Sequence, residues 1–335
     1  MANGSKWING VDSLRFALAL IVLLSHFETP LMPILRESAS PLFQFIGELI
    51  YLAFNGTAAV IGFFIISGFV IHHSSKSGIR NWKLFIIKRY IRIILPLLTI
   101  SILGYKFGSP EKGLLWSLIC ELVYYSLYPL FLALKVNWFK LCVYSFLLSM
   151  ILMLVIAQDD IKAFFNQDDE NFHGLYWQAG IYLTWLVGLP CWLLGVIIAE
   201  KFDAYKKISF NSLVLFRILI FLSSILLQYT RVHLHISYII SMNFYAILLY
   251  YWISNEITYY KDKELSSVFE YLGKFSYSLY ITHPFMYVII PIFIPYTTYT
   301  YPIYIFLALL FSYTFYLIIE KPSHNFARSL SDSDK

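Results

Sequence analysis

The chain has 335 residues, of which 59% are hydrophobic and 13% are charged, and its formal net charge is +5. A soluble domain contains about 25% charged residues, so this composition excludes an ordinary soluble protein and indicates that most of the chain lies in lipid. The small positive excess gives no reason to expect a nucleic-acid partner, because basic residues at one membrane face account for it.

Ten apolar runs approach the length of about 20 residues that a helix needs to cross a bilayer. They predict an all-α, polytopic integral membrane protein with about ten transmembrane helices. The runs are residues 11–30, 57–74, 91–105, 114–134, 141–158, 179–200, 210–229, 236–255, 272–294 and 302–320.

The distribution of basic residues predicts the orientation of these spans. With the N-terminus inside, the inner segments contain 16 Lys and Arg residues and the outer segments contain 5, so the positive-inside rule predicts N-in and C-in. We therefore expect a cytoplasmic N-terminal segment (1–10), a transmembrane domain (11–322) and a short cytoplasmic tail (323–335). The outer loop 158–173 is acidic instead.

The first run contains two residues that are unusual in lipid, Arg15 and His26. They are eleven residues apart, which places both on one face of a helix at a separation of about 16 Å along its axis. Asp12, three residues before Arg15, is spaced to pair with it. This polar stripe predicts a cavity facing the first helix. The alternative is a snorkelling arginine and a core histidine bonded to a neighbouring helix.

Three further polar residues lie in or at the ends of later runs. Glu121 is mid-span, where a carboxyl group must be protonated, hydrogen-bonded or paired with a cation. His283 is also mid-span, and the alternative to a functional role is that it caps the backbone opened by Pro284. Glu320 lies at a helix end, where an ordinary interfacial role is equally expected.

The second and third runs contain small and basic residues. Ser67 lies in "GFFIISGF", where spacing alone favours close helix packing through small residues. Lys88, Arg89 and Arg92 lie at the cytoplasmic end of the third run. Arg89 and Arg92 are one turn apart and suited to gripping phosphate groups, although simple positive-inside anchoring explains any one of them.

Together these stretches resemble the membrane acyltransferase-3 family. The first is similar to the family's opening Asp-x-x-Arg and Arg-x10-His pattern, and the others follow in family order from residue 12 to residue 322. The matching stretches are "VDSLRFALALIVLLSHF", "GFFIISGF", "RYIR", "LWSLICELVYYSLYP", "FSYSLYITHPF" and "IEKP".

The resemblance implies an O-acyltransferase of the cell membrane, most often an O-acetyltransferase. Its donor is cytoplasmic acyl-CoA, typically acetyl-CoA, and its acceptor is a hydroxyl of an envelope glycan or a lipid-linked saccharide, with no metal required. The chain shows no additional hydrolase-like domain, so we expect the stand-alone type.

His26 is suited to be the catalytic base, because its pKa lies near neutrality, and Glu121 is a candidate to orient it. Arg15 is expected on the donor side, and a covalent acyl-histidine remains open. The other candidates are Arg89, Arg92, Ser67 and Lys88 for donor binding, and Asp12, His283 and Glu320 for less defined roles.

Two other classes of protein remain open on the residues alone. A transporter or flippase of a small polar or lipid-linked molecule would also use a bundle with a polar stripe. An envelope scaffold would use these polar residues only structurally and would tolerate His26→Ala. Dependence on a thioester distinguishes the enzyme from both, since a transporter moves its substrate unaltered.

Overall fold

The structure of the protein is a computed structural model that describes residues 8–107, 112–166, 171–261, 263 and 267–330. Its regular elements are helices, and no strand occurs in these described segments, which confirms the all-α class. Three predicted segments lie partly outside the described residues, namely 1–10, 158–173 and 323–335.

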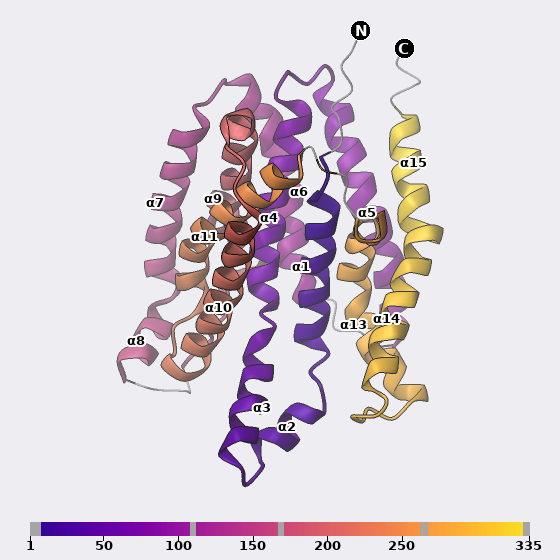
Figure 1. Ribbon diagram of the computed structural model, residues 1–335. Coiled ribbons are helices and arrows are strands. Elements are labelled where there is room, and N and C mark those ends of the chain that lie inside the picture. The colour runs from indigo at the N-terminus through magenta and orange to yellow at the C-terminus, as the bar shows by residue number, and fades with distance from the viewer. Residues whose placement is uncertain (1–7, 108–111, 167–170, 262, 264–266, 331–335) are drawn as a thin grey trace.

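Fifteen α-helices follow one another along the described chain, most of them long (Figure 1). A 3-10 turn, η1 (Phe202–Ala204), and a π-turn, η2 (Tyr316–Glu320), continue two of them. The helices are α1 (Val11–His26), α2 (Leu31–Arg36), α3 (Pro41–Ala53), α4 (Gly56–Ser75), α5 (Trp82–Phe107), α6 (Lys112–Ala133), α7 (Trp138–Ile156), α8 (Gln158–Asn166), α9 (Gly180–Lys201), α10 (Phe210–Leu234), α11 (Tyr238–Tyr260), α12 (Ser267–Gly273), α13 (Ser276–Phe293), α14 (Tyr301–Phe315) and α15 (Lys321–Ser329).

Each of the ten predicted runs falls mainly on one of the long helices, but fewer helices have the length and apolarity of a complete span. Within the described residues six segments do: Pro41–Ser75, Gly113–Ala133, Trp138–Ile156, Gly180–Ala204, Phe210–Leu234 and Tyr301–Ser329. The other four runs correspond to α1, α5, α11 and α13, which are helical but fall short of that criterion.

The C-terminal helix is longer than the sequence predicts. The run 302–320 and the tail beginning at 323 divide a helical stretch that continues from Tyr301 to Ser329, because η2 and α15 extend α14 without a break. This extension brings residues of the predicted tail alongside α5, where Ser323 Oγ donates to the carbonyl of Ile91 at 3.0 Å.

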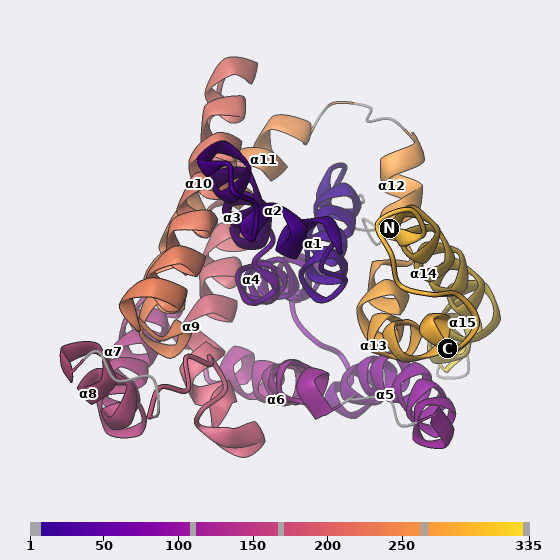
Figure 2. The ribbon, with the colours of Figure 1, turned by 90° about the horizontal axis from the view of Figure 1, so that it is seen from below.

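Helices α4 and α9 pack closely through glycine. A Cβ atom on Gly68 would lie 2.0 Å from the carbonyl oxygen of Trp192, and one on Gly195 would lie 1.9 Å from that of Ile65. Neither position has room for a side chain, so glycine is what allows these two backbones to approach. This contact places α4 at the centre of the bundle, next to α1 (Figure 2).

The start of α1 is fixed from a distance. Glu270 of α12 accepts hydrogen bonds from the backbone N–H of Gly10 at 3.0 Å, from that of Ser13 at 3.3 Å and from the Ser13 hydroxyl at 2.5 Å. Two of these donors are backbone N–H groups at the start of α1, and the first N–H groups of a helix have no partner within that helix. Glu270 therefore acts as a cap supplied by another element.

The outer surface of the bundle is apolar, as expected in lipid. Helix α10 exposes a series of large aliphatic side chains along its length, and only 6% of its apolar stretch is buried inside the protein. A soluble protein does not expose so continuous a surface. The protein is therefore a membrane protein, and α10 is one of its lipid-facing helices.

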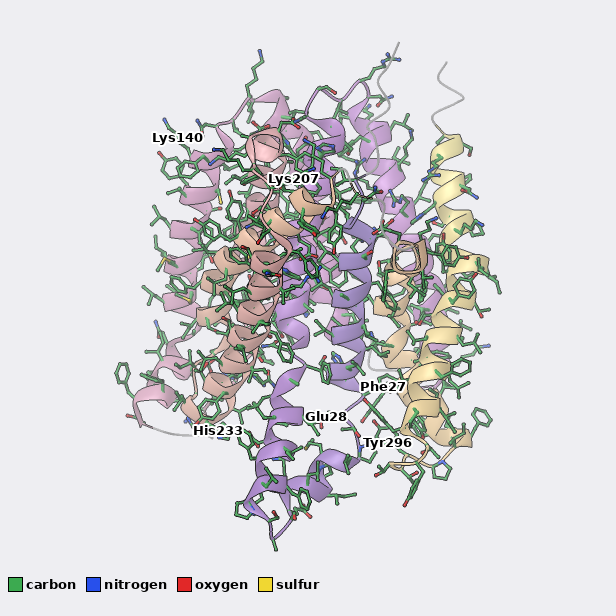
Figure 3. The ribbon with its side chains drawn as sticks, viewed as in Figure 1. Phe27, Glu28, Lys140, Lys207, His233 and Tyr296 are labelled. Carbon is green, nitrogen blue, oxygen red and sulfur yellow. The ribbon has the colours of Figure 1, made fainter. Side chains whose placement is uncertain are left out.

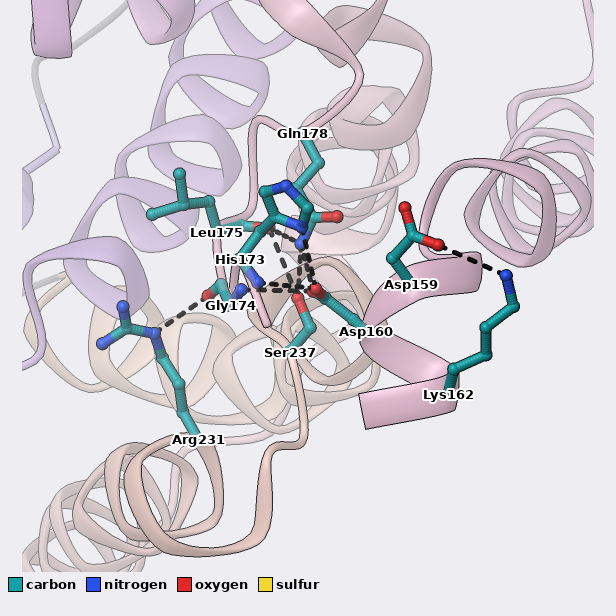
Figure 4. A network of polar contacts seen from close by, with 9 residues as sticks. All are labelled: Asp159, Asp160, Lys162, His173, Gly174, Leu175, Gln178, Arg231 and Ser237. Carbon is teal, nitrogen blue, oxygen red and sulfur yellow. Dashed lines mark hydrogen bonds and ion pairs between the residues drawn. The ribbon is translucent and has the colours of Figure 1, made fainter. Parts of the chain in front are cut away.

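The loop after α8 is organised by one buried carboxylate, Asp160 (Figure 4). It accepts the backbone N–H of His173 at 2.8 Å and that of Gly174 at 3.2 Å, and Gln178 donates to it from its side chain. Burial alone would raise the pKa of Asp160, but hydrogen bonds, first that of Ser237, outweigh it and lower the pKa. Asp160, one of the acidic residues of the 158–173 loop, thus stabilises the structure of this loop.

Candidate functional site

A cavity of about 150 Å³ lies within the bundle, and we call it the basic pocket. It brings together residues of α1, α4, α5, α6, α13, η2 and α15, which are far apart in the sequence. Its polar lining consists of Arg15, Ser67, Arg89, Arg92, Ser117, Glu121, Tyr125, Ser276, Tyr277, Tyr280, Glu320 and His324.

Two arginines of α5 give this pocket an excess of positive charge. Arg89 Nη1 donates to the carbonyl of Phe85 at 3.3 Å, and its Nε is buried without a partner. Arg92 forms neither a hydrogen bond nor an ion pair with any described residue, and Arg89 forms no ion pair within the same part of the chain. The lining also contains Glu121 and Glu320, so three guanidinium groups face two carboxyl groups, and guanidinium groups without a direct ion pair are suited to an anionic ligand. Lys88, on the same helix, does not line the pocket.

Arg15 is the third guanidinium of the pocket, and it is paired. Its Nη1 lies 3.7 Å from Asp12, as the three-residue spacing predicts. Asp12 is buried, and a Cβ atom on Gly273 would lie 2.1 Å from its carbonyl oxygen. Asp12 therefore forms an ion pair with Arg15, and α12 packs closely against the same turn of α1.

Glu121 connects three helices at the pocket wall. It accepts a hydrogen bond from Ser67 Oγ of α4 at 3.1 Å and another from the Tyr125 hydroxyl, one turn along α6. The indole of Trp192 in α9 donates to Ser67 Oγ at 3.3 Å. Ser67 is thus a hydrogen-bonding residue of the pocket, whereas the neighbouring Gly68 performs the packing that its motif favours.

Glu320 is buried and lines the pocket. It is 1% exposed, and it accepts the backbone N–H of Ser278 at 3.0 Å and the Ser278 hydroxyl at 2.5 Å. His324 Nε2 lies 3.6 Å from it, one turn along the chain. The π-turn at 316–320 supports this placement, because such turns frequently occur at functional sites. Sequence analysis missed His324, although its spacing from Glu320 was visible.

His26 lies in a second, larger cavity of about 820 Å³, which we call the His26 pocket. The expectation that Arg15 and His26 face one cavity is therefore wrong: α1 presents Arg15 to the basic pocket and His26 to the other. The lining residues are Ser25, His26, Glu28, Thr29, Pro30, Met32, Pro33, Gly113, Leu114, Pro284, Tyr287 and Tyr296.

The hydrogen bonds of His26 determine its tautomer. Nδ1 lies 2.9 Å from the carbonyl oxygen of Val22, which can only accept, so Nδ1 is protonated. In the neutral ring the lone pair is then on Nε2, which is available as a base. A Cβ atom on Gly56 would lie 2.4 Å from Ser25 Oγ, so the close start of α4 keeps this end of α1 in place. The Val22 carbonyl orients His26, and Glu121, the expected partner, lines the other pocket.

The ring of His283 contacts one residue of each pocket. It is 1% exposed, and its ring centroid is 4.8 Å from that of His26 and 6.0 Å from that of Tyr280. Tyr280 in turn lines the basic pocket. The structure thus brings together the two histidines that the sequence separates by more than 250 residues.

Comparison with known proteins identifies the family of the chain. The family model described as an acyltransferase domain, of the acyltransferase-3 type, matches residues 8–317. No curated protein and no solved structure gives a match. The match spans nearly the whole chain and contains both pockets except for Glu320 and His324, and the chain therefore belongs to the acyltransferase-3 family of membrane acyltransferases.

Proposed function

We propose that the protein is an O-acyltransferase of the cell membrane, which moves an acyl group, most simply acetyl, from acyl-CoA to a hydroxyl of an envelope glycan or lipid-linked saccharide. One observation carries this proposal: the basic pocket and the His26 pocket lie next to each other along the same helices. One offers unpaired cations, and the other offers a base of defined tautomer.

The basic pocket suits the donor. CoA is a polyanion, and Arg89 and Arg92 are the cations of the pocket without an ion-pair partner among the described residues. At about 150 Å³ the pocket holds only part of such a molecule, so we infer that the nucleotide stays outside while the pantetheine arm enters. Arg15, held by Asp12, completes the positive lining.

The His26 pocket suits the acceptor. Its volume of about 820 Å³ is within the range of small-molecule sites, and Tyr287 and Tyr296 supply ring faces beside His26. His26 Nε2 takes the proton of the acceptor hydroxyl as it attacks the thioester carbonyl. The C–O bond of the new ester forms, the C–S bond breaks, and CoA leaves as its thiol once a proton reaches the sulfur.

The two ends of the bundle suggest the sidedness. Lys140 and Lys207 lie at the end of the bundle where α15 ends, and Glu28, His233 and Tyr296 lie at the opposite end (Figure 3). The positive-inside rule predicts that the first end lies in the cytoplasm. The donor then enters from the cytoplasm, and the acceptor meets His26 from the outer side.

The test uses purified protein in liposomes supplied with isotopically labelled acetyl-CoA and an extract of envelope glycans. Mass spectrometry should find the label on the glycan, with a mass increase of one acyl unit that is also missing from cells lacking the protein. Transfer of unaltered glycan across the bilayer without acetyl-CoA would instead establish a transporter or flippase and refute the proposal.

A further inference from the structure

The helices α2 and α3 pack against each other at the proposed outer end of the bundle, and we call this unit the outer hairpin (residues 31–53). It projects past the neighbouring helices at that end (Figure 1). Arg36 Nε of α2 lies 3.0 Å from Glu48 of α3, and a Cβ atom on Gly47 would lie 2.8 Å from the backbone nitrogen of Arg36. An ion pair and a close approach through glycine therefore hold α2 against α3.

One side of α3 is polar, and its groups contact protein. Glu48, besides pairing with Arg36, lies 2.9 Å from His233 Nε2 of α10. Gln44, one turn before Glu48, donates from Nε2 to the carbonyl of Ser38 at 2.8 Å. These contacts join the outer hairpin to the end of α10 and close the connection between α2 and α3.

Another side of α3 is an exposed apolar stripe. Leu42, Phe45 and Leu49 are spaced by three and four residues, which places them within about 60° of one another around the helix, and they are 63%, 60% and 39% exposed. Leu31 and Ile34 of α2 are exposed as well. Soluble proteins rarely expose so apolar a surface, and a helix with separate apolar and polar faces is typical of a lipid interface.

The apolar stripe adjoins the lipid-facing surface of α10. With 25 residues, α10 is about 37 Å long, which exceeds the bilayer core of about 30 Å, so its last turn, with His233, reaches the interface. Phe45 is three residues from Glu48, the partner of His233, and lies at most about 4.5 Å farther out along α3. The headgroup layer on each side is about 5–8 Å thick. The surroundings that border the stripe are therefore lipid.

The outer hairpin also forms one wall of the His26 pocket. Met32 and Pro33 of α2 line that pocket together with Tyr296, which follows α13. The Tyr296 hydroxyl donates to the backbone carbonyl of Glu28 at 2.5 Å, which fixes the segment between α1 and α2. Tyrosine is enriched where a membrane meets water. The His26 pocket is therefore bordered by two elements that belong at the lipid interface.

We propose that the apolar stripe seats the outer hairpin in the outer leaflet, so that the His26 pocket receives an acceptor saccharide carried on a membrane lipid. The acceptor class rests on the acyl transfer proposed above, whereas the seating of the hairpin does not. The lipid anchor stays beside the stripe while the saccharide extends past Met32 and Pro33 toward His26 Nε2. Confinement to the membrane raises the concentration of such an acceptor at the pocket, an advantage that a free glycan lacks.

A polarity-sensitive fluorophore on an introduced cysteine measures the depth of the stripe in nanodiscs, because the three native cysteines are buried. The label sites are Phe45→Cys in the stripe, Leu222→Cys on the exposed surface of α10 as the lipid reference, and Lys206→Cys at the exposed turn before α10 as the water reference. Emission from position 45 should shift to shorter wavelength, toward the lipid reference, and a nitroxide on the lipid headgroup should quench it. The emission maximum of the water reference, without quenching, would refute the seating.

The acceptor class is tested with one extract of envelope glycans in two forms, free and coupled to a dialkyl lipid anchor, in liposomes with acetyl-CoA. The wild type should acylate the anchored form at least about tenfold faster at equal bulk concentration. Phe45→Ser combined with Leu49→Ser should bring the ratio of the two rates toward one. Gln44→Ser, at an exposed polar position of the same helix, is the matched control and should keep the wild-type ratio. Because both rates come from one protein, partial loss of folded protein cancels in the ratio.

Two results would overturn the acceptor class while the wild type is active. Equal rates for the free and the anchored glycan would show that the acceptor need not come from the membrane. An unchanged ratio in the double variant would show that the stripe does not bring the pocket to the leaflet. A wild type that acylates neither form would refute the proposed acyl transfer itself, and the fluorescence measurement would still decide where the outer hairpin lies.

Discussion

Arg92 allows donor binding to be separated from folding. The side chain forms no hydrogen bond or ion pair with any described residue, so Arg92→Met breaks no direct polar contact within the described fold. If Arg92 binds a phosphate of CoA, its loss removes one charge-assisted contact, worth about 1.5–3 kcal/mol. The dissociation constant for acetyl-CoA should then rise by about 10- to 150-fold, with the unfolding temperature little changed.

Arg217 provides the matched control, because it is an arginine of α10 that is fully engaged. Its Nε donates to Glu256 at 3.1 Å. Its Nη2 donates to the same carboxylate and also to the Tyr260 hydroxyl, at 3.2 Å. Arg217→Met leaves Glu256, 4% exposed in its side chain, without its cation. That variant should lose about 1–3 kcal/mol of stability while keeping its affinity for acetyl-CoA.

The assay is calorimetric titration of each protein in nanodiscs, first with acetyl-CoA and then with S-acetyl-pantetheine, which lacks the phosphates. Arg92→Met should weaken binding of the first ligand only. Equal weakening for both ligands would show that Arg92 shapes the pocket without contacting phosphate. Unchanged affinity for acetyl-CoA would show that Arg92 only anchors its helix at the membrane face, which is the alternative explanation of its position in the sequence.

Three further predictions follow from other parts of the molecule. His26→Gln should lower acyl transfer by about 10²–10⁴-fold while acetyl-CoA still binds; an active variant in the transfer assay would move the base elsewhere. The lowered pKa of Asp160 means that its carboxylate stabilises the fold above about pH 4 and loses this contribution as pH falls through the folded-state pKa. Below pH 4 the unfolding temperature should therefore fall less steeply with decreasing pH for Asp160→Asn than for wild type. Equal slopes for the two proteins would contradict the hydrogen-bond network. Reporter fusions should read cytoplasmic after Lys207 and at the C-terminus, and external within 158–173; a cytoplasmic reading within 158–173 would reverse the proposed sidedness.

The charged members of the basic pocket could be predicted from the sequence, because a charge inside an apolar run is conspicuous. Arg15, Arg89, Arg92 and Glu121 were all candidates, and the structure brings them to one cavity. Tyr280 was not a candidate, because one among 27 tyrosines, of which many lie in apolar runs, contains little information.

Depth along the bundle was the property that sequence could not supply. Residue spacing placed Arg15 and His26 correctly on α1, but the level of Glu121 relative to His26 depends on how far α6 slides along α1. That offset is set by tertiary contacts such as those of Ser67 and Trp192 with the Glu121 region. The sequence therefore identified the polar residues but wrongly predicted that Glu121 would be the partner of His26.

The count of ten spans stays a prediction, because only six segments meet the criterion of length and apolarity. Of the four helices that fall short of a complete apolar span, α1 is too short, with 16 residues, whereas α5 and α13 are long enough and line the pockets. Cationic, imidazole and hydroxyl side chains lower the apolarity of the helices that contain them. A helix that builds a polar cavity in a membrane is therefore the one that a criterion of apolarity is least able to recognise.

Two backbone irregularities of the bundle lie at its pockets. Pro284 lines the His26 pocket and removes the N–H that would bond the Tyr280 carbonyl, directly beside His283. The π-turn at 316–320 ends at Glu320, which lines the basic pocket. In lipid an unsatisfied backbone group is tolerated only where protein or a water-filled cavity faces it. At these two positions the freed backbone groups face protein or a cavity, where they can be satisfied, so these two irregularities and the polar side chains of the pockets occur together.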